Sequence, residues 1–152
     1  MPLINPSLTP LRQVAILATD GVIASTLMQA KDFFHMASLR DGRRRGQGLT
    51  PGFRTSIATL SALRPQLIML PAFWGDFDQM LERYPDVIPW LQAEHARGTL
   101  ISAEATGVFW IAAAGLLNGR EATTYWRFFE EFSERFPEVI LCKDKHITDA
   151  DN

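Results

Sequence analysis

The pentapeptide Ala103-Glu104-Ala105-Thr106-Gly107 lies where an enzyme of strand–turn–helix build carries its nucleophile, and its central residue is alanine. The apolar run 99–103 predicts a strand before it, and the pattern of 106–117 predicts a helix after it. This layout is typical of a nucleophile elbow, which exposes a Ser or Cys above a sheet. Alanine has neither a lone pair nor a proton to transfer. The sequence therefore predicts the place of a site and argues against covalent catalysis there.

Thr106 carries the only hydroxyl in this pentapeptide, but no histidine neighbours it in the sequence. We expect its side chain to cap the helix that follows rather than to act as a nucleophile. The first N–H groups of that helix are suited to bind an anion or a carbonyl oxygen. Four aromatic residues are expected beside the same cleft, as the wall of a small-molecule pocket or as ordinary core packing: Phe73, Trp74, Tyr125 and Trp126.

The remaining candidate groups do not form a recognisable catalytic or metal-binding pattern. His35, His95 and His146 lack the spacing of metal ligands, so we predict neither a metal nor a cofactor. The run Arg43-Arg44-Arg45 has no interleaved aromatics and is expected to be a solvated loop rather than a phosphate site. A small buried side chain is expected at Cys142.

The overall composition is that of one globular domain of 152 residues. A net charge of −2 gives no general attraction to nucleic acid or to an anionic membrane. The sequence contains no apolar run of about 18 residues and does not begin like a signal peptide. A single cysteine favours a reducing compartment, so we expect a cytoplasmic protein without membrane association.

The hydrophobic pattern predicts alternating strands and helices. Residues 1–13, with three prolines, indicate an extended arm, and 14–152 form the predicted domain. Strands are predicted at 14–18, 66–71, 99–103 and 139–141, and helices at 25–39, 76–81, 87–97 and 106–117. A further helix begins at Thr123 or Thr124 and ends before Pro137. Strands that are apolar throughout predict a three-layer α/β sandwich with a mostly parallel sheet, whose ligands collect at the carboxyl ends of the strands.

The segment 40–56 contrasts with this regular pattern. It mixes arginine, glycine and proline without periodicity, so we predict a basic loop that ends a helix at Asp41-Gly42. Ile57, Leu60 and Leu63 then predict one or two helical turns before Pro65. Three segments, Asp20-Gly21, residues 71–75 and residues 104–107, are expected to converge at the carboxyl edge of the sheet.

Three blocks of the sequence, 103–109, 112–128 and 135–139, resemble the ThiJ/PfpI domain, in the version that forms the N-terminal half of AraC-type transcriptional regulators. The middle block contains Ala-Gly-Leu-Leu-Asn-Gly-Arg-Glu-Ala-Thr-Thr-Tyr-Trp-Arg, where the family typically reads "AGLLDGR-ATTHWR". The resemblance spans most of the chain from residue 14 onward. It implies a flavodoxin-like fold related to class I glutamine amidotransferases.

Enzymes of this superfamily pair an elbow cysteine with a histidine, often beside an acidic residue. By this resemblance the cysteine corresponds to Ala105, the histidine to Tyr125 and the acidic group to Asp20. A thiolate needs a partner that accepts its proton, and tyrosine, with a pKa near 10, is a poor base at neutral pH. Both members of the nucleophile–base pair are therefore replaced.

Two departures from the family pattern accompany these replacements. The family has a further strand before residues 66–71, where this sequence shows only the loop 40–56. The family domain also continues beyond the position of Asn152, and regulators then add a helix-turn-helix domain. The chain is thus expected to be a C-terminally incomplete domain, either a fragment or a shortened relative.

The resemblance and the replaced residues together predict a non-catalytic, ligand-sensing and dimerising domain of an AraC-type regulator. The predicted binding residues are Asp20, Phe73, Trp74, Ala105, Thr106, Tyr125 and Trp126. The predicted partners are a small metabolite and a second copy of the chain, with DNA bound only through a downstream domain. Two alternatives stay open: a hydrolase, hydratase or amidotransferase-like enzyme that uses Asp20 or Glu104 as a base through water, and an interaction module without a ligand.

Overall fold

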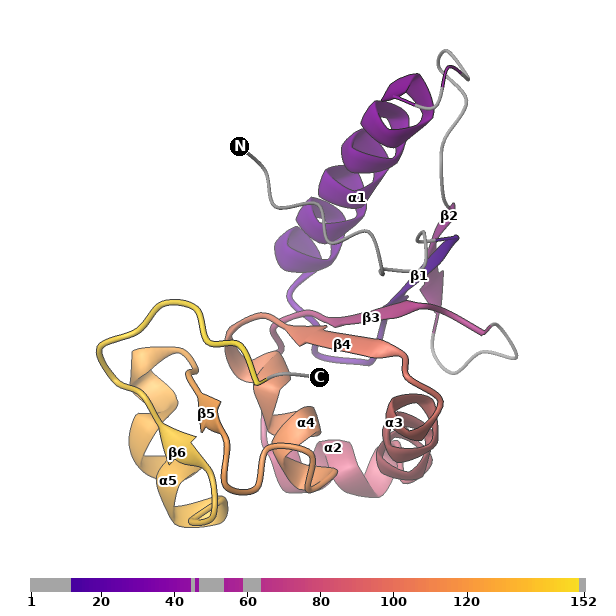
Figure 1. The fold of residues 1–152 in the computed structure, drawn as a ribbon. Coiled ribbons are helices and arrows are strands. Elements are labelled where there is room, and N and C mark those ends of the chain that lie inside the picture. Colours follow the sequence, from indigo (N-terminus) through magenta and orange to yellow (C-terminus); the bar gives the residue numbers. More distant parts are fainter. Residues whose placement is uncertain (1–11, 45, 47–53, 59–63, 151–152) are drawn as a thin grey trace.

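A parallel four-stranded sheet organises the fold in the computed structural model, which describes residues 12–44, 46, 54–58 and 64–150 (Figure 1). Its strands are β1 (Gln13–Leu17), β2 (Arg54–Ala58), β3 (Leu67–Leu70) and β4 (Leu100–Ala103), in the order β2-β1-β3-β4. The helices are α1 (Ala24–Arg44), α2 (Phe77–Arg83), α3 (Val87–Ala96), α4 (Val108–Ala113) and α5 (Phe129–Arg135). Beside them, β5 (Glu121–Ala122) pairs in parallel with β6 (Ile140–Leu141).

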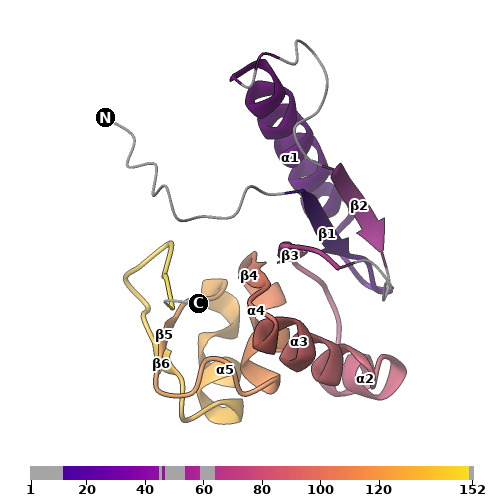
Figure 2. The same cartoon turned by 45° about the vertical axis from the view of Figure 1, so that its right-hand side comes forward.

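Helices cover both faces of the sheet, as Figures 1 and 2 show. On one face, Val14 and Ile16 of β1 are fully buried and pack with Ala30 of α1. On the other face, Ile68 and Leu70 of β3 belong to the larger core that α2 to α5 complete. A strand buried on both faces has to be apolar at every position, which explains the unbroken apolar runs of β1 and β3. The three-layer α/β sandwich predicted from the sequence is confirmed.

The three segments expected at the carboxyl edge of the sheet do meet there. The backbone N–H of Trp74 donates to the carbonyl oxygen of Gly21 at 2.8 Å. The backbone N–H of Phe73 donates to Oγ1 of Thr106 at 2.8 Å, and the same hydroxyl donates to the Phe73 carbonyl oxygen. Gly21 has a φ of +79°, and a Cβ there would lie 2.7 Å from the Trp74 oxygen, so glycine is required at this turn.

The strand that the sequence seemed to lack is β2, which pairs with β1 from Gln13↔Arg54 to Leu17↔Ala58. The prediction of a loop up to residue 56, followed by helical turns from Ile57, is therefore wrong at β2; Leu60 and Leu63 lie outside the described residues. The strand escaped prediction because its sequence, Arg-Thr-Ser-Ile-Ala, has no continuous apolar run. An edge strand needs less apolar sequence, and Ile57 itself is exposed.

Helix α1 continues to Arg44, beyond the end predicted at Asp41-Gly42. Glycine inside a helix costs about 1 kcal/mol relative to alanine, but Gly42 is buried, so tertiary packing outweighs that local preference. Arg43 and Arg44 occupy the last turn, where positive charge interacts favourably with the helix dipole.

Helices α4 and α5 are shorter than predicted. Helix α4 ends at Ala113, and Gly115 follows it with a φ of +75°, the left-handed conformation that often terminates helices. Helix α5 begins only at Phe129 because Thr123 and Thr124 do not cap it: their hydroxyls bond to the carbonyl oxygens of Lys145 and Ala105 instead.

Aromatic rings fill the space between the sheet and α5. Phe109 makes edge-to-face contacts with Phe77 and Phe132, at centroid distances of 5.4 and 5.1 Å. Arg135 of α5 spans this cluster: its guanidinium lies over the ring of Phe77 and pairs with Asp78 of α2. That ion pair lowers the pKa of Asp78. Within the described residues, no helix combines the length and the apolar character that crossing a membrane requires.

Gly107 allows the turn after β4 to approach the end of β3, and its replacement tests how tightly the two are joined. A Cβ at this position would lie 2.2 Å from the Leu70 carbonyl oxygen and 2.8 Å from that of Pro71. We expect Gly107→Ala to lower the free energy of unfolding by about 3 kcal/mol or more, since backbone must move. Gly119→Ala is the control: its φ of +71° brings strain of about 1 kcal/mol, but nothing lies within 4 Å. Urea unfolding that gave equal losses for both variants would contradict this account.

Candidate functional site

The turn after β4 keeps the geometry of a nucleophile elbow although its central residue cannot react. Ala105 has a φ of +47°, and it is the only non-glycine residue with a positive φ among those the structure describes. A non-glycine residue held in this conformation costs on the order of 1–3 kcal/mol, which the surrounding structure must offset. Glu104 before it is extended, and a short 3₁₀ turn (Ala105–Gly107) leads into α4. The predicted strand, turn and helix are thus present, with backbone strain at the nucleophile position.

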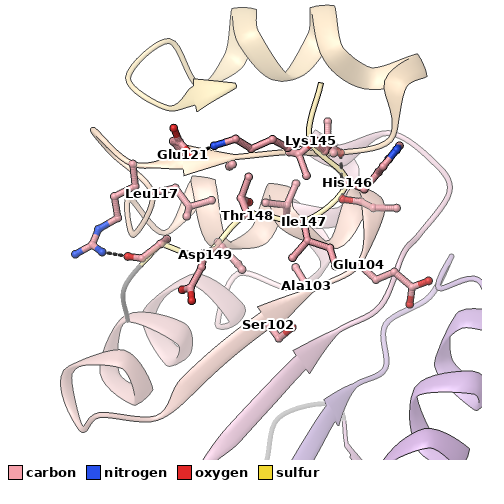
Figure 3. Close-up of a pocket in the computed structure, with 18 of the residues that line it drawn as sticks. Ser102, Ala103, Glu104, Leu117, Glu121, Lys145, His146, Ile147, Thr148 and Asp149 are labelled. Carbon is pink, nitrogen blue, oxygen red and sulfur yellow. Dashed lines mark hydrogen bonds and ion pairs between the residues drawn. The ribbon is translucent and has the colours of Figure 1, made fainter. Parts of the chain in front are cut away.

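A cavity of about 730 Å³ opens beside this turn, and we call it the elbow cavity. Its volume falls within the range of about 300–1,000 Å³ that is usual for small-molecule sites. Strand β4 contributes Ser102 and Ala103, the elbow contributes Glu104 and Ala105, and the loop 120–126 forms a further wall. The last wall comes from the segment 143–150, here called the tail segment; Figure 3 shows it crossing over the cavity opposite Ser102 and Ala103.

Polar contacts hold the loop and the tail segment around the cavity. Oγ1 of Thr124 donates to the Ala105 carbonyl oxygen at 3.0 Å, which ties the loop to the elbow. Oγ1 of Thr123 donates to the Lys145 carbonyl oxygen at 3.0 Å, and the Lys145 ammonium pairs with Glu121 (Figure 3). The guanidinium of Arg120 donates to the carbonyl oxygen of Ala150. Exposed polar groups therefore make several of the contacts that attach the tail segment, and Ala150 also packs against the hydrophobic core.

Three of the seven predicted binding residues line this cavity: Ala105, Tyr125 and Trp126. Thr106 lies beneath it, where its buried hydroxyl is satisfied by the backbone of Phe73. This places Thr106 in a structural role, although not the helix cap that the sequence suggested. Phe73 is buried in the core, stacked on Phe77 at a centroid distance of 5.8 Å. Both residues support the elbow from below without reaching the cavity.

Asp20 and Trp74 lie in a different, smaller cleft together with Gly21, Asp76 and Arg83. The Asp20 carboxylate pairs with the Arg83 guanidinium at 2.9 Å, and both side chains are largely exposed. The backbone N–H of Asp20 donates to the hydroxyl of Tyr84. Asp20 is thus not among the residues that line the elbow cavity.

The sequence does not indicate several of the residues that line the elbow cavity. His95 comes from the end of α3, and His146 and Asp149 come from the tail segment. The tail is polar and has no periodicity, so nothing in its sequence indicates that it folds back over β4. Glu121 was also missed, because the two-residue strand β5 is too short to produce a pattern.

Burial raises the pKa of the Glu104 carboxyl, which stands at the edge of the elbow cavity. The protonated form is thereby favoured in the folded chain relative to the unfolded chain. Across the described residues no group of three histidine, cysteine, aspartate or glutamate side chains is arranged to hold a metal ion. The arrangement offers a walled cavity with aromatic, hydroxyl and charged groups, and its central elbow residue is an alanine.

Comparisons with known proteins agree with this architecture. No protein-family profile matches the chain. The chain is 44% identical over 54 residues to the HTH-type transcriptional regulator ArgR of Pseudomonas aeruginosa, a match that covers 36% of the chain and 16% of that protein. It is 29% identical over 68 residues to the HTH-type transcriptional regulator CdhR of the same organism, covering 45% and 20%. The matched segments thus span a fifth or less of these regulators.

Solved structures show the same fold over most of the chain. A protein from Vibrio parahaemolyticus that was provisionally named a transcriptional regulator superposes with a TM-score of 0.72 at 21% identity. The match covers 91% of the chain and 80% of that structure. An AraC family transcriptional regulator from Pseudomonas putida gives 0.69 at 15% identity, covering 92% and 80%. A two-domain protein with DJ-1/ThiJ/PfpI-like and ferritin-like domains from Anabaena variabilis gives 0.65 at 15% identity, covering 91% and 42%.

The fold is therefore that of the DJ-1/ThiJ/PfpI-like proteins, and the resemblance seen in the sequence is confirmed. Both sequence relatives are named as HTH-type transcriptional regulators, and one of the similar solved structures is named as an AraC family transcriptional regulator.

Strain at the elbow predicts an unusual response to glycine at Ala105. Replacing an exposed helical alanine such as Ala93 by glycine is expected to cost about 0.5–1 kcal/mol. At Ala105 the same change relieves left-handed strain of about 1–2 kcal/mol, which offsets the greater entropy of the unfolded chain. We therefore expect Ala105→Gly to be at least as stable as the unmodified chain, measured by urea unfolding. A loss equal to that of Ala93→Gly would show that the elbow is not strained.

A pH series on Glu104→Gln tests whether ionisation of this carboxyl lowers the stability of the folded chain. Since the folded-state pKa is raised, ionisation destabilises the folded chain as pH rises above about 4.3, the ordinary value for glutamate. The glutamine variant does not ionise and avoids this loss. We expect its melting temperature to exceed that of the unmodified chain near neutral pH and the difference to vanish in acid. The control is Glu130→Gln. Glu130 is an exposed residue of α5 that does not line the cavity, so its replacement should give no such rise in melting temperature.

Proposed function

We propose that this chain is the ligand-sensing and dimerising domain of an AraC-type transcriptional regulator, with an elbow that binds rather than catalyses. The observation that carries this proposal is Ala105: it keeps a strained left-handed backbone beside a cavity of about 730 Å³, and it has no reactive side chain. Strained residues of this kind occur at functional sites more often than elsewhere. An elbow without a nucleophile still shapes the floor of a pocket.

The groups around Ala105 support binding over catalysis. By the sequence resemblance, Tyr125 corresponds to the family's histidine, and Thr124 uses its hydroxyl to fix the loop to the elbow. The hydroxyl of Thr106 is already bonded at both ends to Phe73, so it is not a substitute nucleophile. Of the two acidic groups considered as an alternative general base, Asp20 lines the separate cleft with Arg83, and Glu104 lines the elbow cavity.

The composition of the walls suits a small metabolite with an apolar and a polar part. Tyr125, Trp126 and Phe129 offer aromatic surface, while Ser102 and Glu104 offer hydrogen-bonding groups. Because the tail segment forms one wall, a ligand that contacts it changes the position that is favoured for the tail. In a regulator, that shift would be passed to a downstream helix-turn-helix domain and would alter the spacing of two DNA-binding heads.

Thermal unfolding in the presence of small metabolites tests the sensing role. A ligand at a hundredfold excess over its Kd stabilises the folded chain by about 2.7 kcal/mol, which raises the melting temperature by several degrees. We expect Ser102→Trp, which places an indole against the cavity, to abolish that shift. The same change at Ser133, an exposed position on α5, is expected to leave it intact.

The outcome decides between a sensor and a ligand-free module. A metabolite panel that never raises the melting temperature, or a shift that survives Ser102→Trp, would refute binding in the elbow cavity. For the regulator that carries this domain, promoter binding should change in the presence of the same metabolite. Promoter binding indifferent to that metabolite would remove the link between the cavity and DNA.

A further inference from the structure

The net charge of −2 conceals an uneven distribution of charge along the chain. Residues 1–65 contain eight lysines and arginines against three aspartates and glutamates, whereas residues 66–152 contain seven against fourteen. The first of these segments supplies β1, α1 and β2, which Figures 1 and 2 both place on one side of the molecule, away from α2 to α5. The fold therefore separates a basic side from an acidic one.

Hydrogen bonds gather three arginines of the basic side at the amino ends of the strands. The backbone N–H of Arg54, at the start of β2, donates to the carbonyl oxygen of Arg12 at 2.9 Å. The backbone N–H of Arg12 donates to Oε1 of Gln66 at 3.1 Å, and Arg64 precedes Gln66 by two residues. Because β1 lies between β2 and β3, these arginines stand at the starts of three neighbouring strands, which together cover about 10 Å.

Helix α1 brings three more arginines to the same edge of the sheet. A helix that joins two parallel strands runs back from the carboxyl edge to the amino edge, so α1 ends on the side where β1 and β2 begin (Figure 1). Its residues Arg40, Arg43 and Arg44 lie within about 100° of one another around the helix axis. We call the six exposed residues together the arginine edge: Arg12, Arg40, Arg43, Arg44, Arg54 and Arg64.

The charge of the arginine edge is not compensated by carboxylates. Within the described part of the chain, none of its six guanidinium groups forms an ion pair, whereas Arg83, Arg97 and Arg135 each pair with a carboxylate. Asp41, the acidic residue of the last turns of α1, is partly buried. Together with the carboxyl end of the helix, it contributes about one and a half negative charges, which six arginines outweigh.

We propose that the arginine edge binds the phosphate backbone of duplex nucleic acid. Arginine offers phosphate oxygens two parallel N–H donors and keeps its positive charge throughout the physiological pH range. Six guanidinium groups spread over a helix end and three strand starts are too widely spaced to enclose one small anion, but they suit a row of phosphates. Contacts of this kind position a domain on a duplex without reading its base sequence.

The surface chemistry of the arginine edge favours a duplex over other macromolecules. Single strands are bound through aromatic side chains on which bases stack, and protein interfaces have an apolar centre. The exposed large apolar and aromatic side chains of the described chain all lie outside residues 12–14, 40–44, 54–55 and 64–67. A duplex backbone requires neither kind of contact, because it offers one charge per about 1.7 Å of its axis. The inference goes beyond the proposed function, in which DNA is bound through a downstream domain.

Fluorescence anisotropy of the full chain with a labelled duplex of about 25 base pairs tests this binding at several salt concentrations. With about four phosphates contacted, the logarithm of Kd rises about 3.6 times as steeply as the logarithm of the salt concentration. Raising the salt from about 50 to about 200 mM should therefore weaken binding about 150-fold. No binding at the lower salt concentration, or binding that is indifferent to salt, would overturn the proposal.

Charge removal locates the site. The triple change Arg40→Gln, Arg43→Gln and Arg44→Gln should raise Kd about tenfold or more at low salt and reduce the salt dependence, because fewer phosphates are neutralised. A second triple variant changes the strand half of the edge in the same way and should have an effect of the same kind: Arg12→Gln, Arg54→Gln and Arg64→Gln. All six positions are exposed, so urea unfolding should show that both variants keep the fold.

The control removes the same amount of charge from exposed positions outside the edge: Lys31→Gln, Arg83→Gln and Arg127→Gln. It should change Kd about threefold or less, since the net charge is altered but the edge is intact. Weakening equal to that of the edge variants would show that net charge alone governs binding, and would refute a site at the edge. Binding to phosphatidylserine vesicles without binding to the duplex would assign the edge to a membrane and also refute the proposal.

The thermal shift caused by a metabolite separates this inference from the sensing role. The arginine edge does not line the elbow cavity, so its variants should keep that shift unchanged. If the duplex does not bind and the shift persists, the sensing role stands and this inference falls. Duplex binding through the edge without any metabolite-induced shift would leave this inference standing and remove the sensing role.

Discussion

The close approach between the elbow and the end of β3 is the constraint on which the site depends. Gly107 brings its backbone against the carbonyl oxygens of Leu70 and Pro71, and a Cβ would not fit there. Thr106 closes the same contact by bonding to both backbone polar groups of Phe73. These contacts hold the two residues that follow Ala105, and they thereby constrain the left-handed conformation of Ala105 at the floor of the cavity.

The layers of the fold were predictable from the sequence because burial on two faces leaves a clear signal. Strands β1 and β3 lie inside the sheet, and their apolar runs follow from that position; β4 is an edge strand like β2, but its sequence Leu-Ile-Ser-Ala is still mostly apolar. Strand β2 was not found, since an edge strand with an exposed Ile57 has no such requirement. Helix ends were missed where tertiary contacts decide them: burial of Gly42 lengthens α1, and the contacts of Thr123 and Thr124 shorten α5.

For the candidate site, the sequence could indicate the elbow but not everything that surrounds it. The order of strand, turn and helix located Ala105. The block 112–128, which resembles the family's sequence, located Tyr125 and Trp126, and all three residues line the cavity. Residues after parallel strands share one edge of the sheet, yet they can face different hollows along it. Asp20 and Trp74 therefore lie in the smaller cleft. A polar tail segment without periodicity carries no signal for where it will lie.

The attachment of the tail segment has a consequence for how sites of this kind diversify. Several of its contacts with the rest of the chain are polar bonds at the rim, such as Lys145 with Glu121 and Arg120 with Ala150, although Ala150 also packs against the hydrophobic core. The sheet and the aromatic core do not rely on them. Substitutions in residues 143–150 can therefore recontour one wall of the cavity at little cost to the scaffold, so the shape of the cavity and the stability of the fold depend on separate stretches of the chain. The cavity can thus change its shape through a short peripheral strip while the sheet and the aromatic core stay as they are.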